Sequence, residues 1–254
     1  MTARDPFRTF DWYFSDSSRS DSARHHALKD RPTETKRLMT LVNADSIVHF
    51  ALWSQLPDGH PVRDLWMETN TDLLATIYLA YGGFFRQALT AIRSWFEIAV
   101  HGVYFADHYG QATGRYELWR KGQRDAPANM RNISASLAGR ATSKGPPITE
   151  RQILDRLEPV YASLSLHAHG QGLDLFELQD GRDNVPRYLP KSFDVWLGMV
   201  FEAVDAVYFL YASYFMKQIS AYLLGSPREM KSAKALCRQL DGKLPGYRAI
   251  IDSL

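Results

Sequence analysis

"GGFFRQALTAIRSWFEIAVHGVYF", from Gly82 to Phe105, is the stretch of sequence that decides the predicted fold. It is apolar and aromatic apart from a small set of polar side chains. An α-helix turns about 100° per residue, so five of these polar residues fall within a band about 80° wide. We call them the polar strip: Arg86, Thr90, Arg93, Glu97 and His101. A surface helix normally has a wide polar face, so we predict a helix over residues 83–108 in the middle of a bundle. Its strip should face other protein or a small wet cavity.

The rest of the sequence also favours helices, and the predicted fold class is all-α, a helical bundle with long central helices. Gly82-Gly83 should break or bend the chain, and Pro159 should kink or break the helix that contains it. Around Asp180-Gly181 the sequence favours a small hairpin near residues 173–189. The expected bundle has six to eight helices, with its core formed by residues 37–55, 62–81, 83–108 and 192–224, and with a further helix over residues 149–170.

The predicted domain organisation is simple. Residues 1–35 are polar and serine-rich, and we expect them to be partly mobile. Residues 36–254 should form a single helical domain. Within it, residues 109–147 form a basic segment, in which seven basic and two acidic residues give a local charge of +5. We predict a surface insertion there, either a solvated loop or an RNA contact through Arg120 and Lys121 beside Tyr116 and Trp119.

Composition sets limits on the class of protein. The net charge is +2, so no global field draws the protein to nucleic acid or to a membrane. The single cysteine, Cys237, indicates a reducing compartment, and the N-terminus does not resemble a secretory signal, so we expect a cytoplasmic protein. The segment 195–216 has the length of a membrane span. However, Glu202 and Asp205 would each cost about 2.5–3.5 kcal/mol at a helix centre in lipid, so we expect a buried bundle helix and no membrane contact.

Charges in a buried strip need partners, because an isolated buried ion is costly. Glu97 stands four residues from both Arg93 and His101 and can serve both. We expect Glu202 and Asp205, three apart on the long C-terminal helix, to lie near Arg86 or Arg93. Two interpretations stay open: a structural ladder of salt bridges, or an arginine pair that holds a phosphate while His101 and Glu97 transfer protons or join a metal.

A second group of histidines lies in "YASLSLHAHG", Tyr161 to Gly170. His167 and His169 suit the C-terminal end of a helix, where imidazolium stabilises the helix dipole. The alternatives are a polar active site shared with His101, or a metal site, for which His-x-His alone is a weak signal. No dinucleotide fingerprint, phosphate-binding loop, zinc-protease motif or paired carboxylate-histidine motif occurs, so we predict no cofactor and no metal.

The strip and the later histidines together resemble a group of uncharacterised bacterial all-helical proteins, which are similar to the HEPN superfamily. That resemblance implies compact helical domains that often form homodimers and that, in many cases, act as metal-independent ribonucleases in toxin–antitoxin and anti-phage systems. It covers about half the chain, from residue 72 to 110 and from 153 to 170. The matching residues are Arg86, Gln87, Arg93 and Glu97 in the first part, and Ser165, His169 and Gly170 in the second.

The motif of active HEPN ribonucleases, an arginine and a histidine separated by four to six residues, is not intact on these helices. Its only formal match runs from Arg19 to His25 or His26 in the polar N-terminal segment. An arginine-histidine pair of this kind would therefore require an arginine of one helix to lie close to His169 of another helix in the folded protein. We therefore expect a HEPN-like protein that interacts with RNA or a nucleotide, as a ribonuclease or otherwise. The alternative is a non-enzymatic scaffold or dimerisation module. The predicted catalytic residues are Arg93, Glu97, His101 and His169, and the predicted ligand-binding residues are Arg86, Gln87, Arg120 and Lys121.

Overall fold

A computed structural model describes residues 17–107, 113–123, 130–141, 150–168, 187–240 and 242–254. All regular structure in these ranges is helical, which confirms the predicted all-α fold class. The predicted hairpin falls almost entirely on residues 169–186, outside the described ranges. The helices are α2 (Ser17–Asp30), α3 (Pro32–Gln55), α4 (Pro61–Asp64), α5 (Trp66–Tyr81), α6 (Phe85–Asp107), α7 (Thr113–Arg120), α8 (Met130–Ala141), α9 (Glu150–Ala168), α10 (Pro190–Gly225), α11 (Pro227–Leu240) and α12 (Pro245–Asp252).

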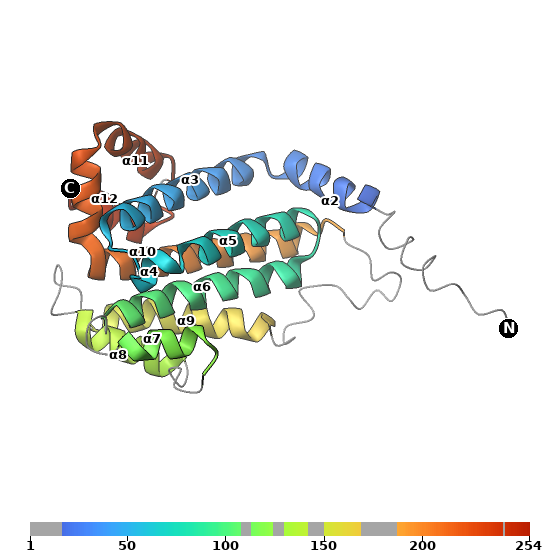
Figure 1. Ribbon diagram of the computed structural model, residues 1–254. Coiled ribbons are helices and arrows are strands. Elements are labelled where there is room, and N and C mark those ends of the chain that lie inside the picture. Colours follow the sequence, from blue (N-terminus) through green and yellow to red (C-terminus); the bar gives the residue numbers. More distant parts are fainter. Residues whose placement is uncertain (1–16, 108–112, 124–129, 142–149, 169–186, 241) are drawn as a thin grey trace.

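Two long helices, α6 and α10, form the centre of the bundle. Helix α6 packs against α5, α9 and α10, and α10 also packs against α3 and α12 (Figure 1). Their largest side chains are fully buried: Trp95 and Phe96 on α6, and Trp196 and Tyr208 on α10. We predicted from the apolar circumference of α6 that this helix lies in the middle of the bundle, and the structure confirms that position.

The helix boundaries follow from local chemistry. Gly83 has a positive φ of 84°, and a Cβ there would lie 2.6 Å from the backbone nitrogen of Arg187. The glycine pair therefore interrupts the helical conformation between α5 and α6. The helix predicted over 62–81 is divided at Leu65 into α4 and α5, whereas α9 continues through Pro159 without a break. Helix α10 bends at Phe215, where φ is −127° and ψ is 16°.

The N-terminal segment is more structured than we predicted. From Ser17 onward it forms α2, which packs on α3 and α5 and buries Ala23 and Ala27. Small apolar side chains every four residues give α2 a narrow packing face that its polar composition conceals.

At the junction with α3, the guanidinium of Arg31 donates two hydrogen bonds to the carboxylate of Asp194, at 2.9 and 3.0 Å. This bidentate pair joins α2 and α3 to the first turns of α10.

The basic segment contains two short helices, α7 and α8. One of them is not confined to the surface, because Met130, Ile133 and Leu137 of α8 are buried in the main core. The hydroxyl of Tyr214 donates a hydrogen bond to the carbonyl oxygen of Leu137 at 2.7 Å. The i, i+3, i+7 spacing of the three apolar residues explains how a mostly polar stretch contributes a helix to the core.

By length and composition alone, α10 is the one described helix that could cross a membrane. Of its most apolar window, 61% is buried inside the protein, as in the core helix of a bundle.

Candidate functional site: a half-buried polar strip on α6

The centre of the polar strip is an ion pair that lies beside α9. Arg93 Nε donates a hydrogen bond to Glu97 Oε1 at 2.8 Å, and Arg93 Nη2 lies 3.5 Å from the hydroxyl of Tyr161. The guanidinium also sits over the Tyr161 ring, 5.6 Å from its centroid, where a cation is attracted to the π-face. Burial acts to lower the pKa of Arg93, but Glu97 outweighs it and the pKa is raised. Arg93 is thus a fixed cation whose orientation is set by both helices.

His101 is held by the same glutamate through a different group. Its Nδ1 donates a hydrogen bond to the backbone carbonyl of Glu97 at 2.6 Å, whereas the Glu97 carboxylate binds Arg93. Its ring stacks on Trp119 of α7, with centroids 5.5 Å apart and planes 18° apart. Burial lowers the pKa of His101. The imidazole is therefore neutral at pH 7 and, because Nδ1 carries the proton, Nε2 has the free lone pair of a general base.

The beginning of the strip is open to solvent, which corrects the prediction that the whole strip faces protein or a cavity. Arg86, Gln87 and Thr90 are exposed, whereas the side chains of Arg93 and Glu97 are only 18% and 31% exposed. The periodicity identified the face correctly, but none of the helices that the structure describes covers the first turns of that face.

The end of α9 lies level with this open part of the strip. Figure 1 shows α9 running antiparallel to α6, and the contact between Arg93 and Tyr161 sets their register. Arg86 is about two turns before Arg93, and Ala168 is about two turns after Tyr161. The last described residue of α9 is thus level with Arg86. The predicted site residue His169, and Gly170 after it, lie outside the described residues.

The acids expected near the strip arginines lie elsewhere. Asp205 of α10 binds Arg156 of α9, with Oδ2 2.5 Å from Nη1, and its Oδ1 accepts a hydrogen bond from the backbone nitrogen of Gly246 at 2.5 Å. Glu202 is exposed. We expected both acids to lie near Arg86 or Arg93. Asp205 instead binds an arginine of α9, and Arg93 takes its counter-charge from Glu97 on its own helix.

The two basic residues predicted to bind a ligand stand at the end of α7. Arg120 Nη1 lies 3.7 Å from carboxylate oxygens of both Asp64 and Glu117, and Arg120 and Lys121 are exposed. Helix α7 meets the strip through the indole ring of Trp119 instead. The cations of α7 therefore flank the strip and do not enter it.

His167, the other histidine of α9, is buried, and its Nδ1 donates a hydrogen bond to the backbone carbonyl of Ser163 at 2.7 Å. This contact within the last turns of the helix favours the structural interpretation of that histidine. Among the residues that the structure describes, histidine, cysteine and acidic side chains do not gather in groups of three or more that could hold a metal ion.

A second polar cluster, which the sequence interpretation missed, lies in the core between α3 and α10. Asp45 and His49 are almost fully buried and form an ion pair at 3.1 Å, and the Tyr208 hydroxyl donates to Asp45 at 2.9 Å. Burial acts to lower the pKa of His49, but Asp45 outweighs it and the pKa is raised. The signal was present in "ADSIVHF", where two ionisable residues stand four apart on an apolar helix face. Because the cluster is sealed from solvent, it fixes the packing of α3 on α10 and offers no access to a substrate.

No family model, curated protein or solved structure matches this chain. The function is therefore inferred from the chain's own residues. On that basis, the strip is the best candidate site, since it combines an oriented cation, a neutral histidine and an exposed cationic end.

Proposed function

We propose that this chain is a HEPN-like helical protein of a bacterial defence or toxin type, which binds RNA or a nucleotide through the polar strip. The observation that carries the proposal is the orientation of Arg93 by Glu97 and Tyr161, on the same helix face as the exposed Arg86. Two arginines two turns apart are about 10 Å from each other. This separation suits contacts to more than one phosphate of a nucleic-acid backbone.

The charge of the strip is suited to moderate phosphate binding. Arg86 and Arg93 contribute two positive charges and Glu97 removes one. Arginine binds phosphate oxygens in a bidentate manner, and Arg120 and Lys121 would extend the contact beyond the strip. The side-chain amide of Gln87, exposed next to Arg86, offers a further hydrogen-bond donor to a bound ribose or phosphate. The Thr90 hydroxyl already donates to the backbone carbonyl of Arg86 at 3.1 Å.

In the enzymatic form of this proposal, His101 is the general base. Its Nε2 would take the proton of a ribose 2′-hydroxyl, whose oxygen attacks the adjacent phosphorus and forms a cyclic phosphate. The departing 5′-oxygen would take its proton from water, because the end of α9 is level with Arg86, about 22 Å along α6 from His101. His169, which follows that end in the sequence, is the alternative candidate for the base. Arg93 would stabilise the charge that develops on the phosphate oxygens.

The binding proposal is tested with a fluorescently labelled single-stranded RNA and anisotropy measurements over a range of salt concentrations. Loss of one phosphate contact in Arg86→Gln should weaken binding and lower the slope of log K against log[salt] by about 0.7. The matched control is Lys36→Gln, which removes one positive charge from an exposed position on α3. Equal effects of the two changes would show that only net charge matters, and would remove the strip as the binding site.

The ribonuclease proposal is tested separately, by following cleavage of the same RNA in Arg93→Ala, His101→Ala and His169→Ala. The expected result is loss of cleavage in Arg93→Ala and in one of the two histidine variants, His101→Ala if His101 is the base, with RNA binding retained in that variant. Cleavage that is unchanged in Arg93→Ala and His169→Ala would remove the catalytic assignment and leave the binding proposal in place.

The alternative function is a non-enzymatic scaffold or dimerisation module in which the strip is structural. The observation in its favour is that the Arg93 guanidinium is already bound by Glu97 and packed on Tyr161. A structural strip predicts lost stability without lost binding when Arg93 is removed. Light scattering on the purified protein would show whether it is a homodimer, as the HEPN resemblance implies.

A further inference from the structure

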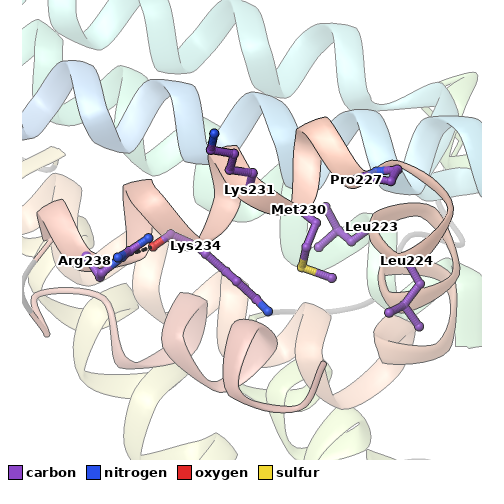
Figure 2. A pocket seen from close by; sticks show the side chains of 7 residues that line it. All are labelled: Leu223, Leu224, Pro227, Met230, Lys231, Lys234 and Arg238. Atoms are coloured by element: carbon purple, nitrogen blue, oxygen red, sulfur yellow. Dashed lines mark hydrogen bonds between the residues drawn. The ribbon is translucent and has the colours of Figure 1, made fainter.

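The C-terminal helices carry a surface that the polar strip does not involve. An open hollow of about 400 Å³ lies where α10 ends and α11 begins (Figure 2). A second hollow of about 760 Å³ lies between α11 and α12, and the two share Lys234 and Arg238. They therefore form one continuous groove along α11, which we call the C-terminal groove. Its first part is lined by Leu223, Leu224, Pro227, Met230, Lys231, Lys234 and Arg238.

The groove is apolar at one end and cationic along its length. Leu224 is 64% exposed, and Met230 faces the same hollow. Lys231, Lys234 and Arg238 follow at i, i+3 and i+7, a spacing that places them on one face of α11. Figure 2 shows Met230 and Lys234 projecting to the same side of α11, with Arg238 farther along the helix and Lys231 projecting the other way. Leu224, Pro227 and Met230 together line one hollow beside this row of cations, and an apolar patch with a polar rim is typical of a binding surface.

The charge of the groove is not neutralised by its own residues. Within the part of the chain that the structure describes, no acidic side chain forms an ion pair with Lys231, Lys234 or Arg238. The one acid that lines the groove, Asp252, pairs with Arg248 at 3.2 Å. A complementary partner must therefore be both acidic and partly apolar.

The shape and lining of the groove select among anionic partners. The cationic row covers about two helical turns, or about 10 Å, which matches acidic side chains on successive turns of a second helix. Methionine adapts to varied apolar side chains, and an amphipathic helix in a groove is a common mode of recognition. No aromatic side chain lines either hollow, so bases have nothing to stack on and single-stranded nucleic acid is a poorer fit.

We propose that the C-terminal groove binds an acidic amphipathic helix of a partner protein. The partner's carboxylates pair with Lys231, Lys234 and Arg238, and its apolar residues pack on Leu224 and Met230. This surface is separate from the polar strip, so the proposal stands or falls independently of RNA binding.

The test uses the full chain and a designed, fluorescently labelled helical peptide. The peptide carries glutamates at i, i+3 and i+7 and leucines on the adjoining face, and a scrambled peptide of equal composition serves as its control. Binding of the ordered peptide should be at least tenfold tighter than that of the scrambled one. Lys234→Glu should abolish this preference, and a peptide with lysine in place of only the glutamate that pairs with position 234 should restore it. Lys36→Glu, on the outside of α3, is the control for net charge.

The apolar half of the proposal is tested by Leu224→Ser, which should weaken binding of the ordered peptide at least fivefold without changing its dependence on salt. Thermal unfolding of each variant should match that of the wild type, because the substituted side chains are exposed. Equal affinity for ordered and scrambled peptides would overturn the proposal. The proposal would also be overturned if Lys234→Glu left peptide binding unchanged but abolished binding to anionic phospholipid vesicles or to single-stranded RNA.

Discussion

The hydroxyl of Tyr208 on α10 donates a hydrogen bond of 2.9 Å to the carboxylate of Asp45 on α3, and that carboxylate also pairs with His49. The structure thus brings a buried anion, a buried cation and a buried hydroxyl into one satisfied network between two core helices. Such networks fix the alignment of helices, but each member depends on the others, because a partner left alone is a buried unsatisfied group.

We predict that Asp45→Ala destabilises the protein by about 2–4 kcal/mol, because it leaves the Tyr208 hydroxyl and the His49 ring buried without their acceptor. Urea unfolding followed by circular dichroism measures this free energy. The control, Ser46→Ala, is on the exposed face of the same helix and should change stability by less than about 0.5 kcal/mol.

Adding His49→Ala to Asp45→Ala should cost less than His49→Ala does alone, since the bond between the two side chains is already absent. The coupling free energy in this double-mutant cycle should be about 1–3 kcal/mol. Additive effects would show that the two residues do not act as a pair.

At the polar strip we predict a smaller effect on stability. Arg93→Ala removes a half-exposed ion pair and a contact with the Tyr161 ring, which together should contribute about 1–2 kcal/mol. A buried structural network would lose about 3–5 kcal/mol instead. The same urea experiment thus separates a functional strip from a structural one, and a loss in the larger range would favour the scaffold interpretation.

Helical periodicity in the sequence was enough to predict α6, its apolar circumference and the alignment of Arg93, Glu97 and His101. It could not predict that Arg86 is exposed, because periodicity identifies a face of a helix but not which neighbouring helix covers it. The pair between Asp205 and Arg156 was missed for a related reason. Sequence spacing identifies partners on one helix, and these two residues stand on different helices whose register depends on the packing of the whole bundle. The pair of Asp45 and His49 could have been predicted from the sequence, since both residues stand on one helix at i, i+4 spacing.

Asp205 gives a prediction with a matched control on the same helix. Asp205→Ala removes the partner of Arg156 and the acceptor for the first turn of α12, so we expect a loss of about 2–4 kcal/mol. Glu202→Ala, one turn earlier and exposed, should cost less than about 0.5 kcal/mol. Hydrogen exchange of the α12 amides should quicken in the Asp205 variant only. Unchanged exchange rates of the α12 amides in Asp205→Ala would show that Asp205 does not stabilise the position of α12.

The pH dependence of stability should contain a contribution from His60. Its ring is buried against Phe215, with centroids 6.0 Å apart, and burial lowers its pKa from 6.5 to about 4. Between these two pH values the unfolded chain binds a proton at this residue and the folded chain does not. The contribution of His60 to stability is therefore present above about pH 6.5 and is lost as the pH falls towards 4.

We expect the urea midpoint of the wild type to fall on going from pH 7 to pH 5, and to fall less in His60→Gln, which cannot titrate. The raised pKa of His49 acts in the opposite direction, because a proton held more tightly in the folded state stabilises that state at low pH and is lost as the pH rises. The comparison must therefore be made between variants and not on the wild type alone. His25→Gln, at an exposed position on α2, serves as the control and should leave the wild-type decline unchanged. If His60→Gln declines as steeply as the wild type, the buried imidazole of His60 is not what makes the fold sensitive to acid.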